Sequence, residues 1–312
     1  MTIINKELPV VIGIDHGYGN IKTASTCFPT GVMASDSKPD FDNDLLVYKG
    51  RYYTIGAGHK EFAADKIMDE DFYILTLSGV ARELKSRNMT SAQVFLAAGL
   101  PLTWVGKQKE RFKAYLLQNE IVDFSFRGSD YHVGFAGAEI FPQGFSAVAG
   151  QLRSFSGINM LCDIGNGTMN TIFIENSRPN MEKRFTEKYG TYQCILQAKE
   201  ALSRELGKDV SETLIDIILR RGKADIAESV LDVIRETAKQ YVGGIMRRLR
   251  EHGYDPELMR LYVMGGGSCL VKNFGEYDPN RVTINEDICA TAKGYEQLAG
   301  RALTLAKGGS VA

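Results

Sequence analysis

The feature that most constrains this chain is a strand that runs into an acid and a glycine-rich turn, a pattern that occurs twice about half a chain apart. The first copy leads from Val10 through Asp15 into Gly17-Tyr18-Gly19-Asn20-Ile21-Lys22, and the second leads from Leu161 through Asp163 into Gly165-Asn166-Gly167-Thr168. Glycines let the chain reverse with bare backbone N–H groups facing outward, which suits a phosphate. Two copies, each opening an α/β half, predict a duplicated fold that closes on one anion from both sides.

The segment after the first turn distinguishes this pattern from other phosphate-binding motifs. Residues 21–26 continue as a second strand, which is typical of a hairpin and not of the strand-to-helix turn of a Rossmann dinucleotide site. The sequence also lacks Gly-x-x-x-x-Gly-Lys-Ser/Thr, His-Glu-x-x-His and Gly-x-Ser-x-Gly. The common P-loop, zincin and serine-hydrolase classes are therefore excluded.

Length and charge limit the possible partners. The 312 residues allow two domains with a core in each, and the formal net charge of −1 gives no basic face for direct nucleic-acid binding. The five cysteines are scattered without metal-ligand spacing, so we expect them to be reduced and mostly buried. The first nine residues carry charge where a signal peptide has an apolar core, and no window approaches a membrane span. The sequence thus predicts a cytoplasmic protein without a membrane partner.

Periodicity and turn residues predict the remaining elements. We expect a strand pair over 45–55 that turns at Lys49-Gly50, a buried strand over 94–99, and strands over 121–126, 131–135 and 138–142. We expect helices over 61–68, 72–85, 107–117, 145–155, 192–206, 212–220, 226–251 and 288–305. The stretch with the first two helices suggests a small inserted subdomain. The last helix is rich in Ala and Gly, so its backbone can approach a neighbour closely.

Asp15 and Asp163 follow the two leading strands, and the functional interpretation is that both hold Mg²⁺, largely through water, opposite the phosphates of a nucleotide. The alternative is that each acid only caps its turn. The pairing of the two motifs favours the metal. Lys22 lies seven positions beyond Asp15 in the sequence, so the hairpin can return it to the same phosphates; an isolated lysine would instead be expected on a solvated face.

Two further segments are candidates for nucleotide binding. Gly265-Gly266-Gly267-Ser268 follows an apolar strand, and a backbone without side chains can lie flat against adenine or ribose; a mobile loop is the alternative. Gln143 in Pro142-Gln143-Gly144 can hold and orient a water for attack on a terminal phosphate. Because Pro-Gln-Gly is ordinary turn composition, a surface turn is the better interpretation of Gln143 in isolation.

The motifs together, in this order along the chain, resemble those of the actin/Hsp70/sugar-kinase superfamily, and most closely the ParM/StbA group of bacterial actin-like proteins. The resemblance rests on 15–22 as phosphate-1, 142–144 as the connecting motif, 163–168 as phosphate-2 and 265–268 as the adenosine motif. It is supported by Ala97-Ala98-Gly99-Leu100-Pro101-Leu102 before a Lys/Phe-rich helix and by Phe141-Pro142-Gln143-Gly144. It spans nearly the whole chain.

The resemblance implies an α/β, actin-like ATPase fold of two duplicated domains with a nucleotide cleft between them. Domain I would comprise 1–155 and 289–312, with an inserted subdomain at about 33–92, and domain II would comprise 156–288. ATP or ADP with Mg²⁺ would bind in the cleft. Gln143 and Asp163 would be catalytic, and Asp15 and Asp163 would face the metal. The implied nucleotide-binding residues are Gly17, Tyr18, Gly19, Asn20, Lys22, Gly165, Asn166, Gly167, Thr168, Gly265, Gly266, Gly267 and Ser268.

The resemblance also implies a biological role. ATP-bound subunits would assemble into filaments, hydrolysis would destabilise them, and a DNA-binding adaptor similar to ParR would couple the filament to plasmid segregation. The chain departs from the family twice: the best-known ParM has a glutamate at the position of Gln143, and family members often have an acid at that of Asn170. Two alternatives stay open, namely a small-molecule kinase of the same superfamily and a non-catalytic, nucleotide-gated scaffold. A kinase would need a carboxylate base near the γ-phosphate, which Gln143 does not supply.

Overall fold

The computed structural model describes residues 8–40, 43–57 and 70–308. The chain divides into two compact units, at Gly150–Gln151 and again at Ile288–Cys289, so that the C-terminal helix belongs to the first unit. The helix expected over 61–68 lies outside the described residues. Among the described helices, none combines the length and the apolar character that crossing a bilayer requires.

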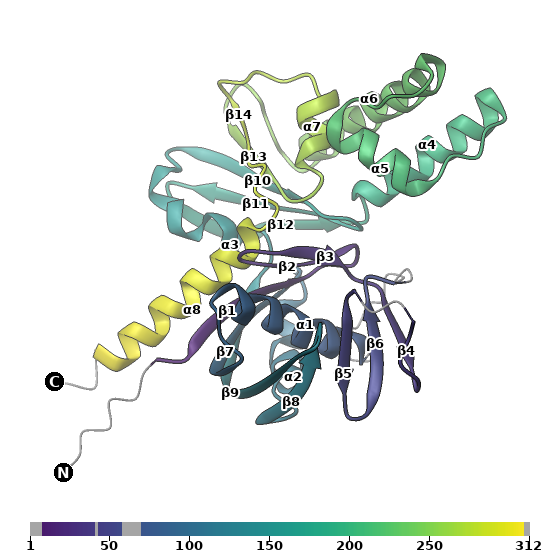
Figure 1. Ribbon diagram of the computed structural model, residues 1–312. Coiled ribbons are helices and arrows are strands. Elements are labelled where there is room, and N and C mark those ends of the chain that lie inside the picture. The colour runs from purple at the N-terminus through teal and green to yellow at the C-terminus, as the bar shows by residue number, and fades with distance from the viewer. Residues whose placement is uncertain (1–7, 41–42, 58–69, 309–312) are drawn as a thin grey trace, which may run out of the picture. The chain divides into compact units, whose positions relative to one another are not determined.

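The first unit is built on one mixed sheet, which has nine strands within the described residues, in the order β3-β2-β1-β7-β9-β8-β5-β6-β4 (Figure 1). In that order, the strands are Cys27–Pro29, Asn20–Thr23, Val10–His16, Ser91–Leu100, Ser129–Pro142, Ile121–Phe126, Leu45–Tyr48, Arg51–Ile55 and Val32–Ser35. β1, β7 and β9 run parallel to one another. β1 also pairs with β2 in an antiparallel hairpin.

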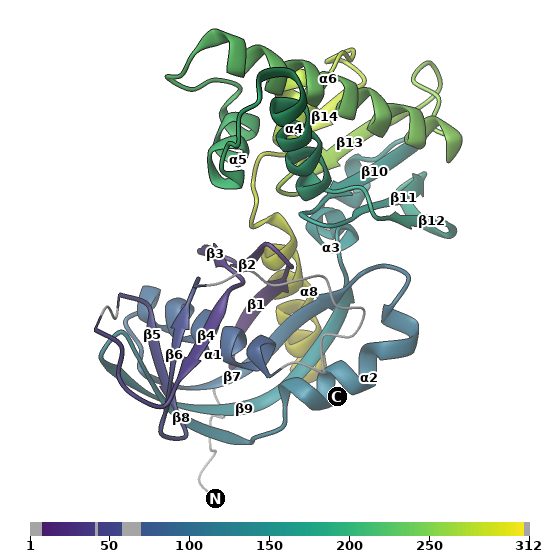
Figure 2. The ribbon, with the colours of Figure 1, turned by 90° about the vertical axis from the view of Figure 1, so that its right-hand side faces the viewer.

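Helices cover both faces of this sheet (Figure 2). Those of the first unit are α1 (Asp71–Ser86), α2 (Val105–Leu116), α3 (Phe145–Val148) and α8 (Ala290–Gly308). Alternation along β1 sets the faces: Ile14 contacts α1, whereas a Cβ at Gly13 would lie 2.0 Å from the carbonyl oxygen of Ala292 in α8. Gly294 of α8 packs equally closely on α3, since a Cβ at this position would lie 2.1 Å from the oxygen of Ser146. The close approach expected of the last helix is thus confirmed.

The described residues between 33 and 92 are integrated into this unit. β5 pairs with β8, which places β5, β6 and β4 in the main sheet. α1 is buried along most of its length, and its Arg82 lies 2.8 Å from the Asp44 carboxylate while stacking over the ring of Phe28. The expected turn at Lys49-Gly50 is confirmed, with φ of 50° and 76°.

The second unit has a smaller sheet, which within the described residues has five strands in the order β12-β11-β10-β13-β14 (Figure 1). These strands are Arg178–Glu187, Met169–Glu175, Ile158–Ile164, Arg260–Met264 and Val282–Ile284, and the helices are α4 (Thr191–Leu206), α5 (Glu212–Arg221), α6 (Glu228–Glu251) and α7 (Ser268–Phe274). β10 pairs with β11 in an antiparallel hairpin and with β13 in parallel. The leading strand of each unit is therefore paired in the same way.

Two expected elements were wrong in detail. The helix expected over 145–155 is a short α-helix, α3, followed by a 3₁₀ helix over Ala149–Ser154, because Gly150 and the Ser154-Phe155-Ser156-Gly157 segment interrupt a helical pattern. The strands expected over 131–135 and 138–142 form one strand, β9, whose register against β7 shifts at Gly137, where φ is +155°. A bulge at a glycine hides the continuity of such a strand from its periodicity.

Candidate nucleotide-binding site

The turn after β1 is closed by its own backbone. The N–H of Gly17 donates to the oxygen of Asp15 at 3.1 Å, and a Cβ at Gly17 would lie 2.5 Å from the oxygen of Asn20, so only glycine fits. Thr30, which directly follows β3, also holds the turn, since its hydroxyl donates to the Gly17 oxygen at 2.8 Å and its N–H donates to the Gly19 oxygen at 3.2 Å. The first predicted phosphate turn is therefore held by hydrogen bonds of its own backbone and of Thr30.

The carboxylate of Asp15 is held by two of the predicted site residues. Asp15 is 6% exposed, and its Oδ2 lies 3.3 Å from the Nζ of Lys22, directly across the hairpin in the β1–β2 register. Its Oδ1 accepts a hydrogen bond of 2.9 Å from the Nε2 of Gln143. Gln143 follows β9, and its N–H donates to the oxygen of Leu100. The sheet thus brings Asp15, Lys22 and Gln143 together, although they come from three separate segments.

Two side chains of this turn pack into the first unit. The ring of Tyr18, a predicted nucleotide-binding residue, meets that of Phe72 edge-on at 6.1 Å. His16 is fully buried, with its Nε2 2.8 Å from the hydroxyl of Thr76 and its ring edge-on to Phe112 at 5.5 Å. His16 is a core histidine.

The second turn repeats the design and is anchored to the start of α4. The N–H of Gly165 donates to the oxygen of Thr168 at 2.8 Å. The first N–H groups of α4 point back at the turn: that of Thr191 donates to the Gly165 oxygen at 3.0 Å, and that of Tyr192 donates to the Asn166 oxygen at 2.9 Å. The N-terminus of α4 therefore holds the carbonyl groups of Gly165 and Asn166 and fixes the orientation of the turn.

The glycine loop after β13 lies directly against this second turn. Gly265 has φ of +85°, and a Cβ there would lie 2.3 Å from the Oδ1 of Asp163. The N–H of Gly267 donates to the oxygen of Ile164 at 2.8 Å, and that of the buried Ser268 donates to the Gly265 oxygen at 3.1 Å. A Cβ at Gly266 would lie 4.0 Å from the guanidinium of Arg220. The second unit thus brings Asp163, the turn and the glycine loop together.

Asn170 occupies the position in the second hairpin that Lys22 occupies in the first. Asp15 pairs with Lys22 in one register and Asp163 pairs with Asn170 in the other. Asn170 is 4% exposed, and its Oδ1 accepts from the hydroxyl of Thr186 at 2.9 Å. The second hairpin therefore places a neutral amide where the first has a cation.

Three residues near the site were missed by the sequence prediction of site residues. They are Gly190 and Thr191, where α4 begins, and Arg220, near the end of α5. The signal for Gly190 was present, because a glycine just before a helix allows close approach: its Cβ would lie 2.3 Å from the Asn166 oxygen. Arg220 pairs with Asp216 at 2.7 Å while facing Gly266.

A fit to Mg²⁺ follows from the acids themselves. Both oxygens of Asp15 already accept from side chains, and the Oδ1 of Asp163 packs closely against the backbone of Gly265. Within the described residues, no three His, Cys, Asp or Glu side chains gather as an all-protein metal site. The carboxylates of Asp15 and Asp163 each suit a cation that keeps most of its waters, as Mg²⁺ does.

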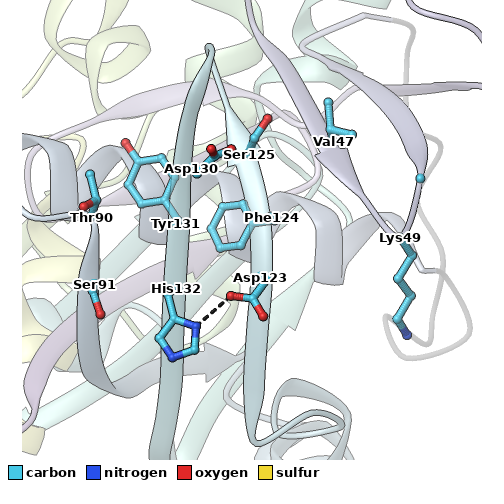
Figure 3. Close-up of a pocket in the computed structure, with 11 residues that line it drawn as sticks. Val47, Lys49, Thr90, Ser91, Asp123, Phe124, Ser125, Asp130, Tyr131 and His132 are labelled. Atoms are coloured by element: carbon cyan, nitrogen blue, oxygen red, sulfur yellow. Dashed lines mark hydrogen bonds and ion pairs between the residues drawn. The ribbon is translucent and has the colours of Figure 1, made fainter.

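A separate hollow of about 540 Å³ lies over β5, β8 and β9 in the first unit (Figure 3). In this view His132 and Asp123 lie side by side on neighbouring strands, with the ring nitrogen 2.6 Å from the carboxylate. Both side chains are mostly exposed. None of the predicted site residues lines this hollow.

Comparison with known proteins identifies the two halves of the chain separately. The family model "Actin like proteins N terminal domain" matches residues 13–145, and the model "Archaeal actin homologue MreB-like, C-terminal" matches residues 161–275. These matches contain both phosphate turns and the glycine loop. No curated protein matches the chain significantly.

Solved structures share the whole fold at low sequence identity. A 15-stranded ParM filament from Clostridium botulinum superposes with a TM-score of 0.76 at 17% identity, covering 95% of this chain and 100% of that chain. An archaeal actin homolog in complex with ADP gives 0.71 at 21% identity, with coverage of 94% and 99%. The apo psk41 ParM protein gives 0.69 at 14% identity, with coverage of 94% and 98%. The two family models together cover most of the chain, and with the shared fold they show that it is an actin-like protein with the actin-like fold.

Proposed function

We propose that this chain is an ATPase that binds ATP with Mg²⁺ and assembles into filaments. The observation that carries the proposal is the repeated hairpin: each unit sets an acid beside a glycine turn, and the acid faces its partner across the same register, Lys22 for Asp15 and Asn170 for Asp163. Backbone N–H groups presented by such turns are suited to phosphate oxygens. The ADP complex of the similar archaeal actin homolog supports the same ligand.

The residues have distinct roles in this proposal. The turns over 17–20 and 165–168 bind phosphates through N–H groups other than those of Gly17 and Gly165, which donate within the turns, and Lys22 adds a positive charge. Asp15 and Asp163 hold water-coordinated Mg²⁺, which, when bound, neutralises charge that develops on the phosphates. Because the Nε2 of Gln143 donates to Asp15, its Oε1 is left to accept from the attacking water and to orient it.

The glycine loop would bind the nucleoside. Residues 265–267 carry no side chains next to Asp163, and the middle glycine, Gly266, is partly exposed and faces Arg220. A flat ligand can lie on such a surface, with the guanidinium of Arg220 as a stacking or hydrogen-bonding group. This assigns Gly265, Gly266, Gly267 and Ser268 to the adenosine.

Filament assembly would serve plasmid DNA segregation through a DNA-binding adaptor similar to ParR. Filament structures among the similar proteins support self-association. The formal net charge of −1 agrees with leaving DNA contact to an adaptor. The five free cysteines agree with a cytoplasmic setting.

Phosphate release from ATP without any added acceptor tests the enzymatic part of the proposal. We expect the purified chain to release phosphate in the presence of Mg²⁺ and to lose this activity when EDTA removes the metal. Release that appears only after addition of a hydroxyl acceptor would identify a small-molecule kinase. Binding of ATP without release would identify a non-catalytic scaffold.

A further inference from the structure

Tyr241 of α6 reaches the second phosphate turn through a single peptide group. Its hydroxyl donates a buried hydrogen bond of 2.6 Å to the carbonyl oxygen of Gly190. The same peptide unit carries the N–H of Thr191, which donates to the oxygen of Gly165 at 3.0 Å. Because a peptide unit is planar, fixing its carbonyl also fixes the direction in which its N–H points.

The contact between this peptide and the turn leaves little freedom. A Cβ at Gly190 would lie 2.3 Å from the oxygen of Asn166 and 2.8 Å from that of Gly165, so the backbone of Gly190 packs on both carbonyls of the turn. Any rotation of the Gly190–Thr191 peptide would therefore break the hydrogen bond from the N–H of Thr191 to the Gly165 oxygen and would also move the turn.

Tyr241 is itself held in place. It is 1% exposed, and its ring stacks on that of Tyr189 with centroids 4.3 Å apart and an interplanar angle of 3°. Tyr189 in turn lies under the guanidinium of Arg248 at 4.2 Å. Burial raises the pKa of the Tyr241 hydroxyl well above its usual value, so the group keeps its proton and remains a donor.

We propose that Tyr241 is a positioning residue for nucleotide phosphates: its hydroxyl fixes the Gly190–Thr191 peptide, which sets the orientation of the turn over 165–168. The inference rests on the proposed function, since it assigns this turn to phosphate. It predicts that losing one hydroxyl, remote from the ligand, weakens phosphate binding while leaving nucleoside binding unchanged.

The test compares Tyr241→Phe with Tyr254→Phe. Tyr254 is a matched control because, within the part of the chain that the structure describes, its hydroxyl is also buried in the second unit but has no hydrogen-bond partner. Affinities for ADP and adenosine are measured by displacement of a fluorescent ADP analogue, at a temperature where circular dichroism shows each variant fully folded.

We expect Tyr241→Phe to weaken ADP binding by roughly fivefold to thirtyfold, the effect of one lost buried hydrogen bond, with adenosine affinity kept. Tyr254→Phe should keep both affinities. Wild-type affinity for ADP in Tyr241→Phe, or an equal loss for ADP and adenosine, would overturn the inference. If the wild-type chain does not bind ADP, the proposed function itself fails.

A second variant reaches the same turn by another route. Gly190→Ala places a methyl group against the Asn166 oxygen and leaves the hydroxyl of Tyr241 intact. The same selective loss of ADP affinity is expected. Should Tyr241→Phe fail to fold, an unchanged ratio of ADP to adenosine affinity in Gly190→Ala would overturn the inference.

Discussion

At the scale of single residues, the structure explains why Gln143 is more than a turn residue. Proline and glycine neighbours made a surface turn its better interpretation in isolation. The structure instead ties its side chain to the Asp15 carboxylate, 128 positions away in the sequence. No periodicity encodes such a contact, because it depends on the parallel pairing of β1, β7 and β9.

Gln143→Ala should slow phosphate release by about tenfold to a thousandfold, the range for losing one positioning or transition-state donor, without weakening ATP binding. Filaments should then persist longer, since assembly needs the γ-phosphate and only disassembly uses the attacking water. Fluorescent-ATP affinity, phosphate release and light-scattering decay on one preparation check this. The exposed Gln118 gives the control, Gln118→Ala, which should behave as wild type. Unchanged release in Gln143→Ala would return Gln143 to a turn role, and lost ATP affinity would make it a binding group.

If Asp163 holds the metal as proposed, Asp163→Ala should abolish Mg²⁺-dependent hydrolysis while the fold stays intact, because the carboxylate lies beside the glycine loop at Gly265 and outside the apolar core. Phosphate release and circular dichroism measure the two effects. Asp225→Ala, at an exposed loop position, should leave both unchanged. Wild-type turnover by a well-folded Asp163→Ala protein would remove the metal role.

At the scale of elements, the sequence predicted the long helices and the strands that lead into the turns. The helix expected over 192–206 is α4, Thr191–Leu206, and it ends at Gly207 with φ of +62°, as a C-terminal glycine predicts. The short strands β3, β4 and β14 were not predicted, because three or four residues carry too little alternation to be recognised.

In the glycine loop after β13, the effect of backbone strain can be distinguished from the effect of steric contact by comparing two glycines. Gly265 and Gly222 both have positive φ, but a Cβ at Gly265 would lie 2.3 Å from Asp163, whereas one at Gly222 would lie 3.5 Å from Asn273. Alanine at either position should destabilise the fold by about 1 kcal/mol or more. Only Gly265→Ala should also weaken nucleotide binding.

Thermal unfolding and ADP titration of Gly265→Ala and Gly222→Ala measure the two effects. Equal nucleotide affinities in the two variants would show that the loop over 265–267 does not face the ligand.

At the scale of the whole molecule, the duplicated architecture could be predicted because both copies of the motif are visible in the sequence. The anchoring of the second turn by Gly190, Thr191 and Tyr241 could not, since it joins the turn after β10, the start of α4 and the middle of α6. Such contacts depend on how helices pack on the sheet, and the residues involved carry no motif of their own.

Assembly should follow the nucleotide. A γ-phosphate held by the repeated turns would favour one subunit shape over others, so ATP or a slowly hydrolysed analogue should give sedimenting polymer and ADP should give less. High-speed sedimentation at matched protein concentration and salt measures this, with Asp225→Ala as a variant that should sediment as wild type does. Equal sedimentation with ATP and ADP would show that assembly does not depend on which nucleotide is bound.

Electron microscopy of the purified chain with ATP and Mg²⁺ tests the central claim most directly. The account predicts filaments with ATP and with a slowly hydrolysed analogue, and few or none with ADP. Single particles in every nucleotide state, at high protein concentration and across salts, would contradict it and would favour the small-molecule kinase.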